Sequence, residues 1–397
     1  METAGFHRLR FSHLSRWLVL FTLAHFGHHL LTALPTPLLP FFRSEFGLDY
    51  AGSGLALSVF SITYGVSQLP GGALADRLGA RRLMTLGIIG VAAAGLAIYF
   101  TRSYFWLLVC LGLMGLVGGG YHPAAPPLVC ATVPPGSRGR ALGVHAIGGS
   151  ASFFIAPLVV AATAVVWGWR ESYLVLAVPT LLFGLLLYVT LGRFEGNNGA
   201  GLAPAADSPP PEAAGRPDFL FFVALSAAGT IMVVAGVSYV PLLLVDGFGV
   251  SEESAAAILA VVYLAGIFAN MAVGFLTDRF SKKAILIATL MASAAALAAF
   301  NAAPYAWGTI GLLSVLGALI VILQNAAESF VMAGTHPRRC SSVLGRYYFA
   351  TIAGGGLFTP LFGALIDRRG FAASYVILAL LLLLAAAFYA AWLRRSG

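Results

Sequence analysis

Residues 71–82 read Gly-Gly-Ala-Leu-Ala-Asp-Arg-Leu-Gly-Ala-Arg-Arg and join two long apolar segments through a very short charged turn. Glycine allows helices to approach closely, the acid lies where one helix ends, and a basic cluster follows it. Residues 274–283, Gly-Phe-Leu-Thr-Asp-Arg-Phe-Ser-Lys-Lys, repeat this arrangement in the second half of the sequence. The chain therefore contains two copies of one unit.

The composition predicts a membrane protein. Of the 397 residues, 59% are hydrophobic and only 10% are charged, and the mean hydropathy is +0.89. A soluble protein of this size needs more polar surface than that. The net charge of +8 comes from short basic clusters between apolar runs, which favours lipid headgroups over nucleic acid as the partner. The three cysteines have no CxxC spacing, so we expect free thiols.

The hydropathy pattern predicts twelve membrane-spanning helices. About 20 apolar residues cross a bilayer as a helix. The predicted spans are residues 16–41, 51–75, 83–101, 104–132, 141–166, 171–191, 218–245, 254–277, 283–301, 305–333, 342–366 and 372–393.

An offset of 202 or 203 residues relates the two halves. The matching pairs are Gln68 with Asn270, His122 with Asn325, and Pro157 with Pro360. We expect an all-α membrane fold of two six-helix pseudo-symmetric halves, residues 1–191 and 218–397. Residues 192–217 are rich in glycine and proline and predict a flexible linker.

The distribution of basic residues predicts the orientation. If both termini are cytoplasmic, 17 of the 23 Lys and Arg residues face the cytoplasm and five face the opposite side. We expect a multi-pass protein of the cell (inner) membrane with both termini inside. Its expected partners are lipids, a small solute and protons, and we expect a monomer.

The two charged turns resemble the signature loop of the major facilitator superfamily, in which GxxxDR, a small residue and basic residues join the second helix to the third. The matching residues are Gly72, Asp76, Arg77, Gly79, Arg81, Gly274, Asp278 and Arg279. The resemblance implies a secondary transporter that works by alternating access. It also implies a gating role, in which Asp76 and Asp278 hold the cytoplasmic ends of the halves together in one state.

Three histidines lie close together in the first span. His25 and His29 are one helical turn apart and share a face near the middle of the bilayer, with His28 beside them. Histidine suits a proton or solute role, and it equally suits hydrogen bonding between helices. Because no carboxylate or cysteine accompanies them, metal binding is the least favoured role, and we expect no metal and no cofactor.

Glu328 is the only acidic residue well within a predicted span, and Arg346 lies early in the next one. Charges inside a membrane are costly and are functional candidates by default. An ion pair between Glu328 and Arg346 would relieve both burial costs, either as a coupling device or as a static link between two helices.

The fourth span contains Gly118-Gly119-Gly120-Tyr121-His122-Pro123, which implies close packing or a bend near His122. This stretch resembles the glycine-rich, His-Pro-containing fourth span of the fosmidomycin-resistance-like exporters. Leu111 stands where many proton-driven antiporters have arginine, so any proton coupling falls on the histidines or on Glu328. Gln68, Asn270, Asn325 and His145 complete the polar residues of a candidate solute path, although amides and imidazoles also link membrane helices.

The function expected from these features is proton-coupled export of a small organic solute. The sparse and mostly neutral path lacks the fixed cations that a polyanion importer needs. Proton-coupled uptake of a metabolite or organic anion is the rival, and a non-transporting receptor or scaffold is the alternative of another class. An enzyme or an ATP-driven pump is disfavoured, since the sequence has neither HExxH nor GxxxxGK[ST].

Overall fold

The structure is a computed structural model that describes residues 16–134, 137–197, 216–300, 307–335 and 337–396. Within these ranges, all regular secondary structure is helical. The helices are α1 (Arg16–Thr32), α2 (Leu39–Phe46), α3 (Tyr50–Leu78), α4 (Ala80–Phe100), α5 (Tyr104–Gly118), α6 (Tyr121–Cys130), α7 (Arg138–Val166), α8 (Arg170–Asn197), α9 (Pro217–Ser238), α10 (Val240–Phe248), α11 (Glu252–Arg279), α12 (Lys282–Ala299), α13 (Trp307–Ala333) and α14 (Pro337–Ser396).

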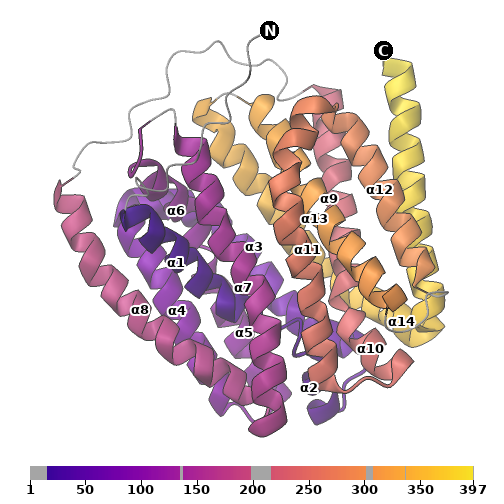
Figure 1. Ribbon diagram of the computed structural model, residues 1–397, viewed down its shortest axis with the longest axis horizontal. Coiled ribbons are helices and arrows are strands. Elements are labelled where there is room, and N and C mark those ends of the chain that lie inside the picture. The colour runs from indigo at the N-terminus through magenta and orange to yellow at the C-terminus, as the bar shows by residue number, and fades with distance from the viewer. Residues whose placement is uncertain (1–15, 135–136, 198–215, 301–306, 336, 397) are drawn as a thin grey trace.

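The helices form twelve membrane crossings in two groups of six. In the described ranges, nine helical segments are long and apolar enough to cross a membrane. One of them, Val343–Arg395, has the length of two crossings and turns at Gly370, whose φ is 72°. The pair α1 and α2, together with α3, supplies the remaining two. Helices α1 and α3–α8 lie on one side of the molecule and α9–α14 on the other, while α2 lies next to α10, below α11 in the view (Figure 1).

Three of the predicted spans are interrupted. Pro35 and Pro37 separate α1 from α2, because proline has no backbone N–H to donate within a helix. Gly119 and Gly120 separate α5 from α6. The third break falls at Tyr239, between α9 and α10. The hydropathy pattern could not reveal these breaks because the apolar runs continue through them.

The duplication is visible in the turns that follow α2 and α10. Each helix ends at a glycine in the left-handed region, Gly47 with φ 60° and Gly249 with φ 67°. Each next helix then begins behind a capping residue. The Asp49 side chain accepts a hydrogen bond from the Gly52 N–H, and the Ser251 side chain accepts one from the Ser254 N–H.

The linker predicted for residues 192–217 lies mostly outside the described residues. α8 continues to Asn197, past the predicted boundary, and α9 begins at Pro217. Residues 198–215 belong to the part that the structure does not describe.

The two halves meet along two pairs of helices. α3 packs along α14, and α7 packs along α11. Small residues allow this approach: a Cβ at Gly65 would lie 2.9 Å from the Ala353 backbone nitrogen, and one at Gly356 would lie 3.0 Å from the Ser58 carbonyl oxygen. One large cluster of buried apolar side chains extends through both halves.

Side chains also join the halves at the end of the molecule where α2 and α10 lie (Figure 1). Arg43 forms an ion pair with Asp246 at 3.0 Å, and the Tyr50 hydroxyl donates to the other Asp246 oxygen at 2.8 Å. The Asp367 carboxylate accepts hydrogen bonds from the backbone N–H groups of Tyr50 and Ala51, both at 2.9 Å. These residues, Arg43, Tyr50, Asp246 and Asp367, are called the outer latch below, where outer refers only to their place at one end of the molecule.

Candidate functional site

A cavity of about 240 Å³ lies between the two halves. The first half contributes Gln68 from α3 and His122 from α6. The other lining residues come from α9, α13 and α14 and are Thr230, Gln324, Glu328, Tyr347, Tyr348, Thr351 and Ile352. Most of them carry hydrogen-bonding groups, so the cavity suits a small polar solute.

Glu328 is half-buried in the wall of this cavity. Its hydrogen-bonding partner is Tyr348, one helix away on α14. Tyr348 also lines the cavity, and the Arg346 side chain is exposed. The ion pair expected between Glu328 and Arg346 stays a prediction. The cavity lining places the Glu328 carboxyl group where solute could contact it.

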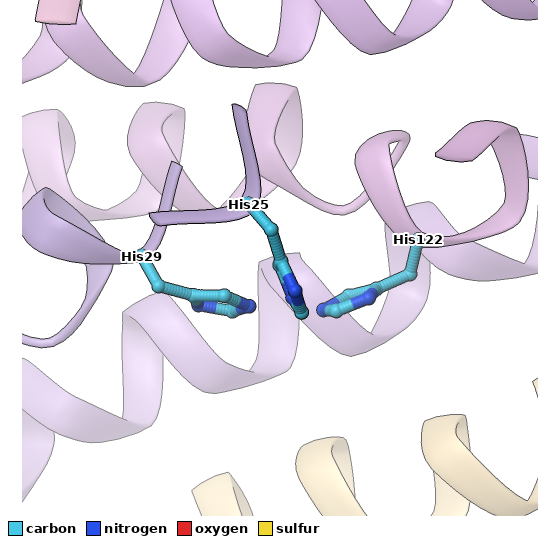
Figure 2. Close-up of side chains that lie close together, drawn as sticks. All are labelled: His25, His29 and His122. Carbon is cyan, nitrogen blue, oxygen red and sulfur yellow. The ribbon is translucent and has the colours of Figure 1, made fainter. Parts of the chain in front are cut away.

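A cluster of imidazole rings lies on the side of the cavity that the first half forms. His25 and His29 come from α1 and His122 from α6, and their rings point toward one another (Figure 2). The ring centroid of His25 is 4.8 Å from that of His29 and 5.7 Å from that of His122. His122 belongs both to this cluster and to the cavity wall.

A hydrogen bond fixes the tautomer of one of these rings. His25 Nδ1 lies 2.9 Å from the His145 carbonyl oxygen, which can only accept, so Nδ1 carries the proton. His25 Nε2 is then an acceptor, and it is buried without a hydrogen-bonding partner among the described residues. His29 Nδ1 forms a hydrogen bond of 3.0 Å with the Thr32 hydroxyl.

The neighbouring rings hold the cluster in place. His145 stacks on His25 with centroids 4.4 Å apart, and His28 stacks on Tyr121 at the same separation. His28 Nε2 bonds to the Tyr64 hydroxyl at 3.1 Å. His28 thus faces a different partner from His25 and His29, as the helical spacing of the three residues predicts.

Glycines on α7 make room for His25. A Cβ at Gly149 would lie 2.7 Å from His25 Cε1, closer than real side-chain atoms approach. A Cβ at Gly148 would overlap the Thr22 carbonyl oxygen of α1. The adjacent glycines let α1 and α7 pack closely enough for the His25 ring to lie between them.

The amide residues predicted from the repeat occupy two different places. Gln68 lines the cavity, and its amide nitrogen is buried without a partner among the described residues. Asn270 and Asn325 instead bond to each other at 3.2 Å, and Asn270 also donates to the Ser150 hydroxyl at 3.4 Å. This second group links α11, α13 and α7, and neither asparagine is among the cavity-lining residues.

The predicted gating loops are described only in part. Gly79 has φ 84°, and Arg81 donates to the Tyr188 carbonyl oxygen at 2.7 Å while lying over the Tyr188 ring. Arg77 and Arg279 have exposed side chains. The predictions for Gly72, Asp76, Gly274 and Asp278 concern residues whose side-chain surroundings lie outside the described part.

The sequence analysis assigned no role to the charges of the outer latch. One signal of their position was present. Gly47 and Gly249 end α2 and α10 and are 202 residues apart, so the repeat pairs Arg43 with Val245, the residue before Asp246. Arg43 and Asp246 therefore lie at neighbouring positions of the repeat and not at the same one.

Comparison with known proteins supports the fold and the family. The sequence model of the family named Major Facilitator Superfamily matches residues 21–350 and, in a second match, residues 220–397. The chain is 26% identical to the multidrug resistance protein MdtG of Enterobacter lignolyticus, over 92% of this chain and 89% of that protein. It is 23% identical to the hexuronate transporter of Bacillus subtilis, over 83% of each chain.

Solved structures share the architecture. A bacterial homologue of the human lysosomal transporter Spinster, in an inward-facing and unoccupied conformation, superposes with a TM-score of 0.76 at 20% identity, covering 94% of this chain and 95% of the other. The peptide transporter POT superposes with a TM-score of 0.75 at 16% identity, covering 96% and 94%. Since both the family model and the twelve-helix fold extend over most of the sequence, this transporter belongs to the Major Facilitator Superfamily.

Proposed function

We propose that this transporter exports a small organic solute in exchange for protons, with Glu328 as the proton-carrying residue. The observation that carries the proposal is the position of Glu328 in the wall of a cavity between the two halves. A carboxylate is costly at membrane depth, so proton uptake and release there can be tied to solute occupancy. The bond from Tyr348 gives the ionised form one partner when the solute is absent.

The cavity supports a small polar solute. Its volume of about 240 Å³ is below the range of ≈ 300–1,000 Å³ that is usual for drug-sized ligands. Gln68, Gln324 and Tyr347 offer donors and acceptors along the wall. Relatives named for multidrug resistance and for hexuronate transport are consistent with an organic solute.

The proposed cycle is rocking of residues 1–191 against residues 218–397 around this cavity. The outer latch closes the end where α2 and α10 lie. With both termini in the cytoplasm of the inner membrane, as the basic residues predict, that end faces outward. The structure then corresponds to the state that is closed toward the outside, and export requires the latch to open.

Uptake of an organic anion is the second candidate. It is favoured by the relatives named as hexuronate and gallate transporters, the latter from Pseudomonas putida at 24% identity over 86% of each chain. The hydroxyl groups of Tyr347 and Tyr348 are donors that suit a carboxylate. A receptor or scaffold that moves no solute is the alternative of a different class.

The test is solute-induced proton flux in proteoliposomes that contain a pH-sensitive dye. The panel consists of sugar acids, aromatic acids, neutral sugars and cationic drugs, each added to one face of the vesicle. We expect one class to move protons in the direction of antiport in the wild-type protein. Glu328→Gln should abolish that flux while leaving solute binding measurable.

The matched control is Glu253→Gln, which removes a carboxylate at the start of α11 that is not among the cavity-lining residues. Its proton flux should equal that of the wild type. Flux of the opposite sign would establish uptake, and full proton coupling in Glu328→Gln would refute the assignment of Glu328. A folded protein that moves no solute in the panel would count for the receptor alternative.

A further inference from the structure

We propose that His25, His29 and His122 form a binding site for a divalent transition-metal cation of the zinc class, at the edge of the solute cavity. The sequence favours a metal least, because no carboxylate or cysteine accompanies the histidines of α1. The fold adds the third ligand from α6, and one ligand nitrogen from each ring lies within 4.8 Å of the others. Figure 2 shows the three rings converging from two helices.

The ligand set suits zinc. Three imidazoles with one open position are a recurring arrangement for Zn²⁺ in proteins, whereas Mg²⁺ and Ca²⁺ prefer oxygen ligands. Zn–N bonds of about 2.0–2.1 Å in a tetrahedral site imply N···N separations of roughly 3.4 Å. The present separations are at most 4.8 Å, so binding requires the nitrogens to approach by up to about 1.4 Å.

The hydrogen bonds around the cluster also suit a metal. A metal-bound histidine usually donates its other N–H to a carbonyl or another acceptor, which fixes the tautomer. His25 does so through Nδ1, to the His145 carbonyl oxygen, and His29 Nδ1 is bonded to the Thr32 hydroxyl, which can accept in the same way. Nε2 of each ring is then the nitrogen that can bind the cation, and His25 Nε2 is buried without any other partner in the described part.

A divalent cation bound to the three histidines needs an anionic group to balance its charge, and the neighbouring cavity is where such a group can approach. Three neutral imidazoles do not compensate a divalent cation, and no carboxylate belongs to the group. His122 shares the cavity wall with Glu328, so a cation at the cluster lies beside a space where an anionic oxygen can approach. Imidazole favours zinc and its neighbours in the first transition series over hard cations.

The proposal of metal binding is independent of the proposal of proton-coupled transport, so an experiment that refutes one leaves the other intact. The experiment uses the full chain, purified in detergent and stripped of metal with a chelator. Zn²⁺ is titrated in competition with a chromophoric chelator, and Co²⁺ is added separately as a spectroscopic probe. We expect one Zn²⁺ per chain and the visible absorption bands of four-coordinate Co²⁺.

Single replacements assign the ligands. His25→Gln, His29→Gln and His122→Gln should each weaken Zn²⁺ binding by about tenfold or more, since even second-shell changes cost 10- to 100-fold. His28→Gln is the matched control. It removes a buried imidazole of the same helix that is not one of the three proposed ligands and whose Nε2 bonds to the Tyr64 hydroxyl instead. Its Zn²⁺ affinity should remain within a few-fold of the wild type.

A further variant is expected to gain a spectroscopic signal, because loss of Zn²⁺ binding alone could also result from misfolding. His122→Cys places a thiolate ligand at the same position, so Co²⁺ binding should acquire a thiolate-to-cobalt charge-transfer band in the ultraviolet. The three native cysteines are replaced in this variant and in its parent, so the band can come only from a thiolate at residue 122. The proposal is overturned if the folded wild type binds no Zn²⁺, if all three Gln variants bind it as well as the wild type, or if folded His122→Cys lacks the band.

Discussion

His122 shows how much a single residue depends on its surroundings. The sequence places it in a glycine-rich span, but its neighbours come from elsewhere in the chain: His25 and His29 from α1 and Glu328 across the cavity. Helical spacing was sufficient to predict that His25 and His29 share a face. It could not bring His122 and His145 to them, because contacts between helices depend on packing and not on spacing within one helix.

Glu45 offers a test at the scale of one residue. It lies beyond the apolar part of α2, where the Arg170 guanidinium and then the Trp169 indole N–H bond to its carboxylate and hold the pKa of Glu45 below its usual value. A carboxyl group whose pKa is lowered by folding stabilises the protein above the unfolded value of about 4.3, and this contribution is lost as the pH falls through the folded value.

Glu45→Gln should therefore lower the unfolding temperature at neutral pH. The effect should be small, because exposed ion pairs contribute about 0–1 kcal/mol. The difference from the wild type should vanish in acid, below the folded pKa of Glu45. Thermal unfolding of the detergent-solubilised protein over a pH series measures this, with Glu253→Gln as the control. A difference that is the same at every pH would contradict the explanation.

At the scale of the helix, close packing depends on glycines whose positions are unremarkable in the sequence. α13 contains Gly311 and Gly317, six residues apart. A Cβ at Gly317 would overlap the Val262 carbonyl group of α11, whereas nothing lies within 4 Å of a Cβ at Gly311. Hydropathy predicted both spans, but it does not distinguish a glycine at a helix contact from a glycine facing outward.

Gly317→Ala should destabilise the protein by about 1–3 kcal/mol, the usual cost of overpacking, because α11 and α13 would have to move apart. Gly311→Ala should raise stability by about 0.5–1 kcal/mol, since alanine loses less entropy than glycine in a helix. Unfolding temperatures of the two variants, measured side by side, check the pair. Equal shifts in the two variants would show that contact at Gly317 is not the cause.

The breaks within the crossings also belong to this scale. Prolines separate α1 from α2, and glycines separate α5 from α6. The hydropathy pattern predicts that both groups of residues lie inside continuous spans. Membrane helices tolerate such residues when neighbouring groups satisfy the freed backbone. Whether a helix bends or ends at them is therefore decided by its neighbours. At the third break, the Tyr239 hydroxyl bonds to the Tyr50 and Thr359 carbonyl oxygens, two groups distant in sequence.

For the whole molecule, the number of crossings and the twofold repeat were predictable, because membrane thickness fixes the length of a span and the repeat offset is constant. The conformational state was not predictable. It depends on which end of the interface is joined, and the outer latch consists of three charged residues and one tyrosine that are unremarkable in the sequence. Only the relative position of the halves gives those charges a role.

A charge exchange tests the outer latch. Asp246→Arg places two cations together and should favour the state that is open on the latch side. The double variant Arg43→Asp with Asp246→Arg should recover closure, because the ion pair is restored with its signs reversed. Labelling of Thr351→Cys in the cavity wall, by a membrane-impermeant maleimide added on the latch side and in a background without the native cysteines, reports the opening.

We expect the labelling rate to be highest for Asp246→Arg, and the labelling rate of the double variant to be close to that of the parent. Arg43→Ala with Asp246→Ala is the matched control, since it removes the attraction without adding repulsion and should be intermediate. Equal labelling of all four proteins would show that the pair does not hold that end closed.

The ion pair between Arg43 and Asp246 also constrains the ancestry of the chain. The glycines that end α2 and α10 are 202 residues apart, so the repeat pairs Arg43 with Val245 and Asp246 with Ser44. A dimer of two identical six-helix subunits that carried either copy of this segment would lack the pair, because each copy supplies only one of the two charges at these positions. The attraction that now joins α2 to α10 therefore arose only after the two copies had diverged.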